Sequence, residues 1–226
     1  LENGKVEKIE NVSAKHAEET LSQKELSQLE IAQSEIRCRS VKQLQVRHLN
    51  FAYPDGKQIL KDISFKAEKG QMIGITGPVA CGKSTLGKVF LCEYPYEGQI
   101  LVDGKELQNM PQSWQTNIIG YLGHDPELFN DSIEHNVLLG EKKDPELYLK
   151  AVCMVCMAEE VNEMDVDLQT LVGNGGVRLS GGQGKRLALA RTLCHKKPVL
   201  VLDDPFSALD KSTERQIFAN LKAQAK

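Results

Sequence analysis

The sequence predicts an α/β fold, and three features support this class. Short apolar or alternating segments typical of strands are interspersed with segments of helical character. A glycine-rich stretch, Gly77–Ser84, joins an apolar run to a helical one. The chain has 226 residues, of which 41% are hydrophobic and 26% charged, and this composition suits a soluble globular domain with a core of normal size.

The order of the segments divides the chain in two. Residues 1–43 are polar and rich in Glu, Lys, Gln and Ser, and we interpret them as a linker or extension that is partly helical or disordered. Residues 44–226 form the predicted domain. Its expected strands are 44–53, 59–67, 71–76, 99–102, 118–122 and 198–202, and its expected helices are 84–91, 180–194 and 213–225. The stretch 126–171 is expected to be mainly helical.

Composition excludes several classes of protein. The net charge of −3 gives no basic surface, so we expect no nucleic-acid partner. No stretch approaches the run of about 18 apolar residues that crosses a bilayer. The six cysteines are scattered, which is typical of reduced thiols in a cytosol. Cys153 and Cys156 form a CxxC inside an expected helix over 146–160, without a second ligand pair for zinc, so we expect packed or idle thiols.

The segment Gly77–Ser84 matches the phosphate-loop pattern GxxxxGK[ST] completely. Its glycines let backbone N–H groups point at phosphate oxygens, and the helix that follows adds a favourable dipole. Lys83 supplies a charge to the phosphates, and the Ser84 hydroxyl is a candidate Mg²⁺ ligand. The expected ATP-binding residues here are Gly77, Pro78, Val79, Ala80, Cys81, Gly82, Lys83, Ser84 and Thr85.

A second acidic element follows an apolar run. The segment Val199–Leu202 ends in Asp203 and Asp204. A phosphate-loop protein needs a further Mg²⁺ anchor, usually an aspartate at the end of a nearby strand, and Asp203 fits this role. Asp204 is then placed to orient an attacking water. The sequence therefore predicts a site for ATP and Mg²⁺.

Three further segments resemble those of ATP-binding cassette (ABC) ATPases. Leu179–Gln183 reads LSGGQ and resembles the family's signature, Ser207–Asp210 resembles its D-loop, and Tyr53 falls where the family stacks an aromatic ring on adenine. The resemblance extends from about Val41 to the end of the chain. It implies a P-loop NTPase core with an antiparallel β subdomain near 44–103 and a helical subdomain at about 126–180.

The resemblance also implies a function. Two such cassettes dimerise head to tail on Mg-ATP, so Ser180, Gly181, Gly182 and Gln183 would contact ATP held by a second cassette, and Asp210 would lie at the dimer seam. Hydrolysis would power transport through transmembrane domains, and the pattern looks most like exporters. The stretch Gly173–Gly176 resembles a loop that touches those domains. The expected location is the cytoplasmic face of the cell inner membrane.

The sequence departs from the family pattern at three points. His124 stands where the family has a glutamine near Mg²⁺ and water, and Asp204 stands where it has a catalytic glutamate. The side chain of Asp204 is one methylene shorter than that of glutamate, which argues against fast hydrolysis at this site. The other expected catalytic residues are Lys83 and His124. The family's switch histidine follows one more strand. The chain stops at Lys226 before it, so we interpret the sequence as truncated there.

Two alternatives to the transport ATPase remain open. One is a slow or degenerate ATP-binding module that regulates a heterodimeric transporter, which Asp204 favours. The other is a soluble ABC ATPase, whose coiled-coil insertions or second cassette are not seen in this sequence.

Overall fold

The computed structural model describes residues 40–140, 145–163, 171–172 and 179–225. Almost all of the predicted extension over residues 1–43 lies outside these ranges, and so does the loop Gly173–Gly176. Within the described ranges, no helix is long and apolar enough to cross a membrane.

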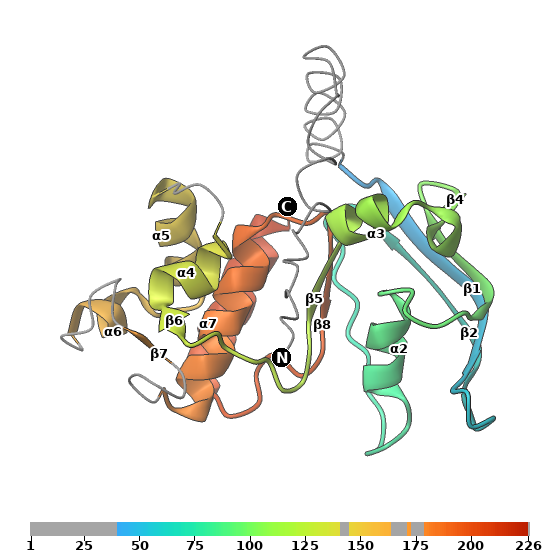
Figure 1. Cartoon of the computed structure of the whole chain (residues 1–226), viewed down its shortest axis with the longest axis horizontal. Coiled ribbons are helices and arrows are strands. Elements are labelled where there is room, and N and C mark those ends of the chain that lie inside the picture. Colours follow the sequence, from blue (N-terminus) through green and yellow to red (C-terminus); the bar gives the residue numbers. More distant parts are fainter. Residues whose placement is uncertain (1–39, 141–144, 164–170, 173–178, 226) are drawn as a thin grey trace, which may run out of the picture. The chain divides into compact units, whose positions relative to one another are not determined.

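The first half of the described chain forms an antiparallel sheet with the strand order β2-β1-β3-β4 (Figure 1). Its strands are β1 (Gln43–Ala52), β2 (Gln58–Glu68), β3 (Glu97–Val102) and β4 (Lys105–Glu106). Val46 of β1 pairs with Phe65 of β2 and with Ile100 of β3. The predicted antiparallel β subdomain is confirmed. The alternation in β1 is interrupted where the register shifts between Val46 and Leu49, and His48 there has a φ of 46°.

One core lies between this sheet and three short helical elements. These are α2 (Lys83–Val89), the 3₁₀ helix η1 (Leu107–Asn109) and α3 (Gln112–Ile118). Leu49, Ile100 and Leu107 are completely buried in this core, and α2 contributes Leu86 and Val89. The phosphate-loop segment is therefore anchored to the antiparallel sheet through the helix that follows it.

Two parallel strands carry the acidic segment. They are β5 (Ile119–Leu122) and β8 (Val199–Leu202), paired from Ile119 with Val199 to Leu122 with Leu202. Because they are parallel, their carboxyl ends lie at the same edge. Leu200 is 39% exposed, so the prediction of a buried strand at 198–202 is wrong for the face of β8 on which Leu200 lies.

The predicted strand at 71–76 is also wrong. The segment forms no strand and pairs with none among the described residues, where the parallel sheet has only β5 and β8. Met72, Ile73 and Ile75 are 44–51% exposed. An apolar run becomes a strand buried on both faces only when neighbouring strands and covering helices are present. The sequence shows that the run is apolar, but it does not show whether other strands lie beside it.

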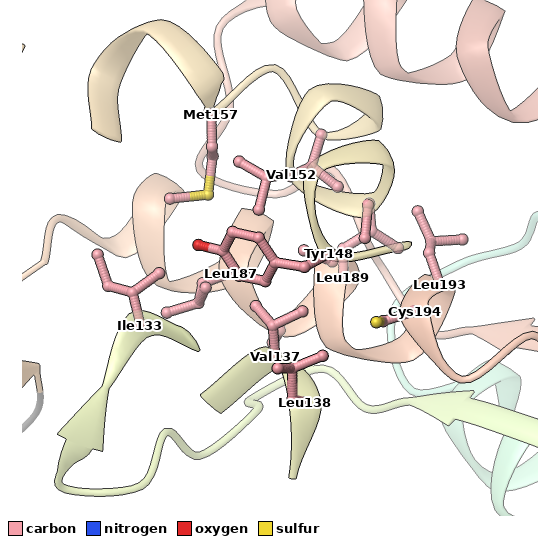
Figure 2. Close-up of a cluster of buried hydrophobic side chains, with 14 of the residues drawn as sticks. Ile133, Val137, Leu138, Tyr148, Val152, Met157, Leu187, Leu189, Leu193 and Cys194 are labelled. Atoms are coloured by element: carbon pink, nitrogen blue, oxygen red, sulfur yellow. The ribbon is translucent and has the colours of Figure 1, made fainter. Parts of the chain in front are cut away.

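The remaining elements surround the long helix α7 (Gly181–Cys194). It packs against β5 and against α4 (Ile133–Leu138) and α5 (Pro145–Met154), and α5 also contacts α8 (Lys211–Gln224). Figure 2 shows a cluster of buried side chains from these helices, which includes Leu187 and Leu189 of α7, Val137 of α4 and Tyr148 of α5. The shorter elements are α6 (Ala158–Glu163), β6 (Asp131–Ser132) and β7 (Leu171–Val172).

Replacing Val137 with alanine is expected to lower the free energy of unfolding by about 2 kcal/mol, because the side chain is completely buried against α7. Urea denaturation of the chain measures this change. Leu149→Ala is the matched control, since Leu149 on α5 is 56% exposed and its truncation is expected to cost less than about 0.5 kcal/mol. Equal losses in both variants would contradict the assignment of the core.

Candidate nucleotide-binding site

The loop Gly77–Ser84 is exposed and closes on its own lysine. The ammonium of Lys83 donates hydrogen bonds to the carbonyl oxygens of Gly77 at 2.9 Å and Pro78 at 2.7 Å. It also lies 3.7 Å from the sulfur of Cys81. Val79, at the tip, is 95% exposed. The loop thus holds a cation at its centre with the surrounding backbone open to solvent.

Gly82 fixes where the loop meets the antiparallel sheet. Its φ of 97° is in the left-handed region, and a Cβ there would lie 2.9 Å from Ile59 and 3.1 Å from Leu60. A side chain is therefore excluded both by conformation and by space. Because Leu60 pairs with Phe51 of β1, the same contact brings the loop close to the end of that strand, where Tyr53 follows.

Tyr53 belongs to a cluster of three aromatic rings. Its ring meets Phe51 edge to face at 5.0 Å and Tyr94 at 5.9 Å between centroids. A cavity of about 160 Å³ lies beside the rings, lined also by Lys88, Val89 and Glu93. Edge-to-face packing holds Tyr53 at a fixed angle. Tyr94, which sequence reasoning did not single out, supports the ring predicted to stack on adenine.

The helix after the loop packs against the parallel strands. Gly87 of α2 lies where a Cβ would be 3.3 Å from the ring of Tyr121 and 3.5 Å from Val201. Val201 stands two residues before Asp203, whose N–H donates to the carbonyl of Leu122 at 2.8 Å. In Figure 1 the loop before α2 and the carboxyl ends of β5 and β8 lie at the same end.

The oxygen donors at this end suit magnesium. Ser84 is exposed at the start of α2, and Asp203 is half-buried at the end of β8. Hydroxyl and carboxylate oxygens are ligands that Mg²⁺ takes, with phosphate and water completing its shell. Burial raises the pKa of Tyr121, and the negative charge of Asp203 raises it further. The Tyr121 hydroxyl is buried without a hydrogen-bond partner among the described residues. The donor set fits the predicted ion.

The structure brings His124 and Asp204 together. The imidazole Nδ1 lies 3.2 Å from Asp204 Oδ2, and Nε2 lies 3.9 Å from Asp125 Oδ1. Asp204 has a φ of 52°, a conformation that few residues other than glycine, asparagine and aspartate adopt readily. The two side chains are within ion-pair distance, and the neutral imidazole has one nitrogen that can accept a proton. Two groups with proton-transfer chemistry are therefore in contact, from loops after neighbouring parallel strands.

Ser180 begins α7 as predicted. Its hydroxyl accepts from the N–H of Gln183 at 3.2 Å, and the Gln183 side chain accepts from the N–H of Ser180 at 2.9 Å. This reciprocal capping box fixes the first turn. A Cβ on Gly182 would lie 2.7 Å from the carbonyl oxygen of Ala208, so the helix start rests directly on the segment after β8.

The residues behind the helix start were not identified from the sequence. Arg186 is buried and binds Glu160 at 2.7 Å and the carbonyl of Cys156 at 2.8 Å. Glu160 in turn accepts from Gln183 at 3.2 Å. The expected continuous helix over 146–160 is wrong, since α5 ends at Met154 and α6 begins at Ala158. Between them, Cys156 takes a φ of 56° and is half-buried, whereas Cys153 is exposed.

Comparison with known proteins points the same way as this geometry. A family model described as "ABC transporter" matches residues 60–207, more than half of the chain. The chain is 37% identical over 183 residues to the "Probable multidrug resistance ABC transporter ATP-binding/permease protein YheI" of Bacillus subtilis, covering 79% of this chain and 31% of that protein. It is 40% identical over 182 residues to the "ATP-dependent lipid A-core flippase" of Pseudomonas syringae pv. tomato, covering 79% of this chain and 30% of that protein.

A solved structure is similar over the same region. It is described as "Structure of a bacterial Atm1-family ABC exporter with ATP bound", with a TM-score of 0.77 and 31% sequence identity. The match covers 82% of this chain and 33% of that chain. The chain thus spans about a third of the length of these relatives.

Proposed function

Because the chain belongs to the ABC transporter family, we propose that residues 44–226 are its Mg-ATP-binding cassette, with a helical subdomain at about 126–180. In this proposal the cassette dimerises on ATP with a second cassette, and hydrolysis powers export through transmembrane domains at the cytoplasmic face of a membrane. The observation that carries it is the phosphate loop, whose helix α2 packs against β8, the strand that Asp203 follows.

The geometry supports a separate role for each group. Lys83 neutralises phosphate charge and exchanges its bonds to the Gly77 and Pro78 carbonyls for phosphate oxygens. Ser84 and Asp203 hold Mg²⁺, which supplies further charge neutralisation when bound. Tyr53 stacks on the adenine and is held by Phe51 and Tyr94. The backbone N–H groups at the remaining positions of the loop are donors to the phosphates.

The signature residues serve the second cassette in this proposal. The hydrogen bonds of Ser180 and the closest neighbours of Gly181 and Gly182 come from Gln183, Ala208 and Leu209, on the chain's own α7 and the segment after β8. In this proposal the helix start contacts the ATP of the neighbouring cassette on a different side from Ala208 and Leu209. A helix start with its first N–H groups toward a γ-phosphate is electrostatically favourable.

A second candidate is a slow, regulatory site, and the contact between His124 and Asp204 favours it. The carboxylate of Asp204 is one methylene shorter than a glutamate and is already engaged by Nδ1 of His124. In this candidate, the shorter side chain and the contact with His124 both increase the distance between the carboxylate and a water beside the γ-phosphate. A displacement of about 1 Å can lower a rate on the order of 100-fold. In this candidate the chain holds ATP to keep the dimer closed, and fast turnover occurs at the partner's site.

The proposed function is tested by nucleotide binding with two probes. Tyr53→Ala is expected to raise the Kd of Mg-ATP about tenfold, because base stacking on an aromatic ring is worth about 1–3 kcal/mol. The Kd of inorganic triphosphate is expected to stay within about twofold, since it has no base. Calorimetric titration of the full-length protein measures both. Absence of Mg-ATP binding to the wild type would overturn the proposal, and equal losses for both probes would remove Tyr53 from the adenine site.

A further inference from the structure

Lys185 joins the signature helix to the acidic segment. It stands on α7, in the turn after Ser180–Gln183, and its side chain is partly buried. Its ammonium donates to the carbonyl oxygen of Asp204 at 3.0 Å and also to the hydroxyl of Ser207. The Ser207 hydroxyl lies 3.3 Å from the same carbonyl oxygen. One cation therefore binds two groups of the segment that follows β8.

Lys185 bonds the main chain of Asp204, whereas His124 contacts its side chain. Asp204 has a φ of 52°, and such a conformation persists when its surroundings over-determine it. The carboxylate is bound by His124 at 3.2 Å, and the carbonyl is bound by Lys185. Hydrogen bonds from a charged donor are stronger than neutral ones. Asp204 is thus held at both ends, from two different elements.

The same segment touches the start of α7. The Cα of Gly182 approaches the carbonyl of Ala208 so closely that a Cβ would lie 2.7 Å from it, and a Cβ on Gly181 would lie 3.8 Å from the Ala208 side chain. Ala208 also has a positive φ, of 66°. The start of α7 and the loop that follows β8 therefore pack directly against each other, and Lys185 bonds from one to the other.

We propose that Lys185 is a positioning residue that locks Asp204 and the segment Pro205–Asp210 to the signature helix. This inference rests on the proposed function, in which Asp204 acts on the chain's own ATP and Ser180–Gly182 act on the neighbouring cassette's ATP. Lys185 then couples the two sites within one chain, because a shift of α7 is transmitted to the Asp204 peptide. It touches neither nucleotide, so it affects turnover and not ATP affinity.

The test compares steady-state hydrolysis and ATP binding in the purified full-length transporter. Lys185→Met keeps the aliphatic stem and removes the ammonium. It is expected to lower kcat about tenfold, because the Asp204 peptide loses its anchor. KM and the Kd of Mg-ATP are expected to stay within about twofold. Lys185→Arg restores a cation with suitable donors and is expected to keep kcat within about threefold of the wild type.

Two further variants distinguish positioning from a general loss of stability. Lys222→Met removes an exposed lysine from the last turn of α8 and is expected to leave kcat unchanged. Ser207→Ala combined with Lys185→Met is expected to be slower than Lys185→Met alone by no more than about threefold, because the two changes share the Lys185–Ser207 contact and Ser207→Ala additionally removes only the 3.3 Å contact with the Asp204 carbonyl.

Three results overturn the inference. They are an unchanged kcat in Lys185→Met, a loss that Lys185→Arg does not restore, and a loss accompanied by an equal rise in the Kd of ATP. Wild-type protein that binds no ATP would overturn the proposed function itself and the inference with it. Normal ATP binding with an insensitive Lys185 would overturn the inference alone.

Discussion

Asp204→Glu is expected to raise ATP turnover by about ten- to hundredfold while the Kd of Mg-ATP stays within about twofold. The longer side chain carries its carboxylate beyond the contact with His124 at 3.2 Å and toward the position of the attacking water. Asp204→Asn is expected to remove most of the remaining turnover, since an amide cannot accept a proton as a carboxylate does. Phosphate release by the full-length transporter measures both.

The neighbouring carboxylate provides the control for these variants. Asp125 lies 3.9 Å from the other nitrogen of His124, and its side chain is 92% exposed. Asp125→Asn is expected to change turnover by less than about twofold. Fast turnover in the wild type that Asp204→Asn abolishes would make Asp204 a working catalytic carboxylate. In that case the slow-site candidate would be wrong, and the transport ATPase would remain.

Lys83→Met is expected to raise the Kd of Mg-ATP about 100-fold. The ammonium is the charge at the centre of the loop, and in this structure it donates to the carbonyls of Gly77 and Pro78. Phosphate oxygens carry negative charge and take over these bonds when ATP binds. Charge-assisted hydrogen bonds are worth about 1.5–3 kcal/mol each, so losing the ammonium lowers affinity by this order. Fluorescent-nucleotide titration measures the Kd.

A lysine outside the loop separates this effect from a change in net charge. Lys61 on β2 is exposed, and Lys61→Met is expected to leave the Kd within about twofold. The melting temperature of Lys83→Met serves as the second control, because the ammonium also bonds the carbonyls of Gly77 and Pro78 within the loop. An affinity for Mg-ATP unchanged by Lys83→Met would show that the triphosphate binds elsewhere in the protein.

Much of the fold could be predicted because its signals are local. The strands at Gln43–Ala52 and Gln58–Glu68 have apolar residues at strand spacing, and the helix at Gly181–Cys194 begins at a serine with a glutamine three residues later. These signals need no knowledge of distant residues. The candidate ATP-binding and magnesium residues were likewise identified from short motifs, and their roles stay predictions until ligand binding is measured.

Other features were missed because they depend on long-range contacts. The segment 71–76 has the composition of a buried strand, but no strand within the described ranges pairs with it, and its side chains are exposed. A ladder requires a neighbour, which the segment's own residues do not encode. The break between α5 and α6 was missed for a related reason. Cys156 turns there with a φ of 56° and is held by Arg186 of another helix.

The sequence by itself determined the α/β class, because strand-like and helix-like segments alternate along the chain. It also predicted the phosphate loop around Lys83 and the acidic strand end, because each is a short pattern of residues. Only the tertiary structure decided that His124 meets Asp204 and that Lys185 binds the Asp204 carbonyl. Those contacts join residues that no local periodicity relates. They arise because parallel strands β5 and β8 end at one edge and the start of α7 packs against the loop beyond it.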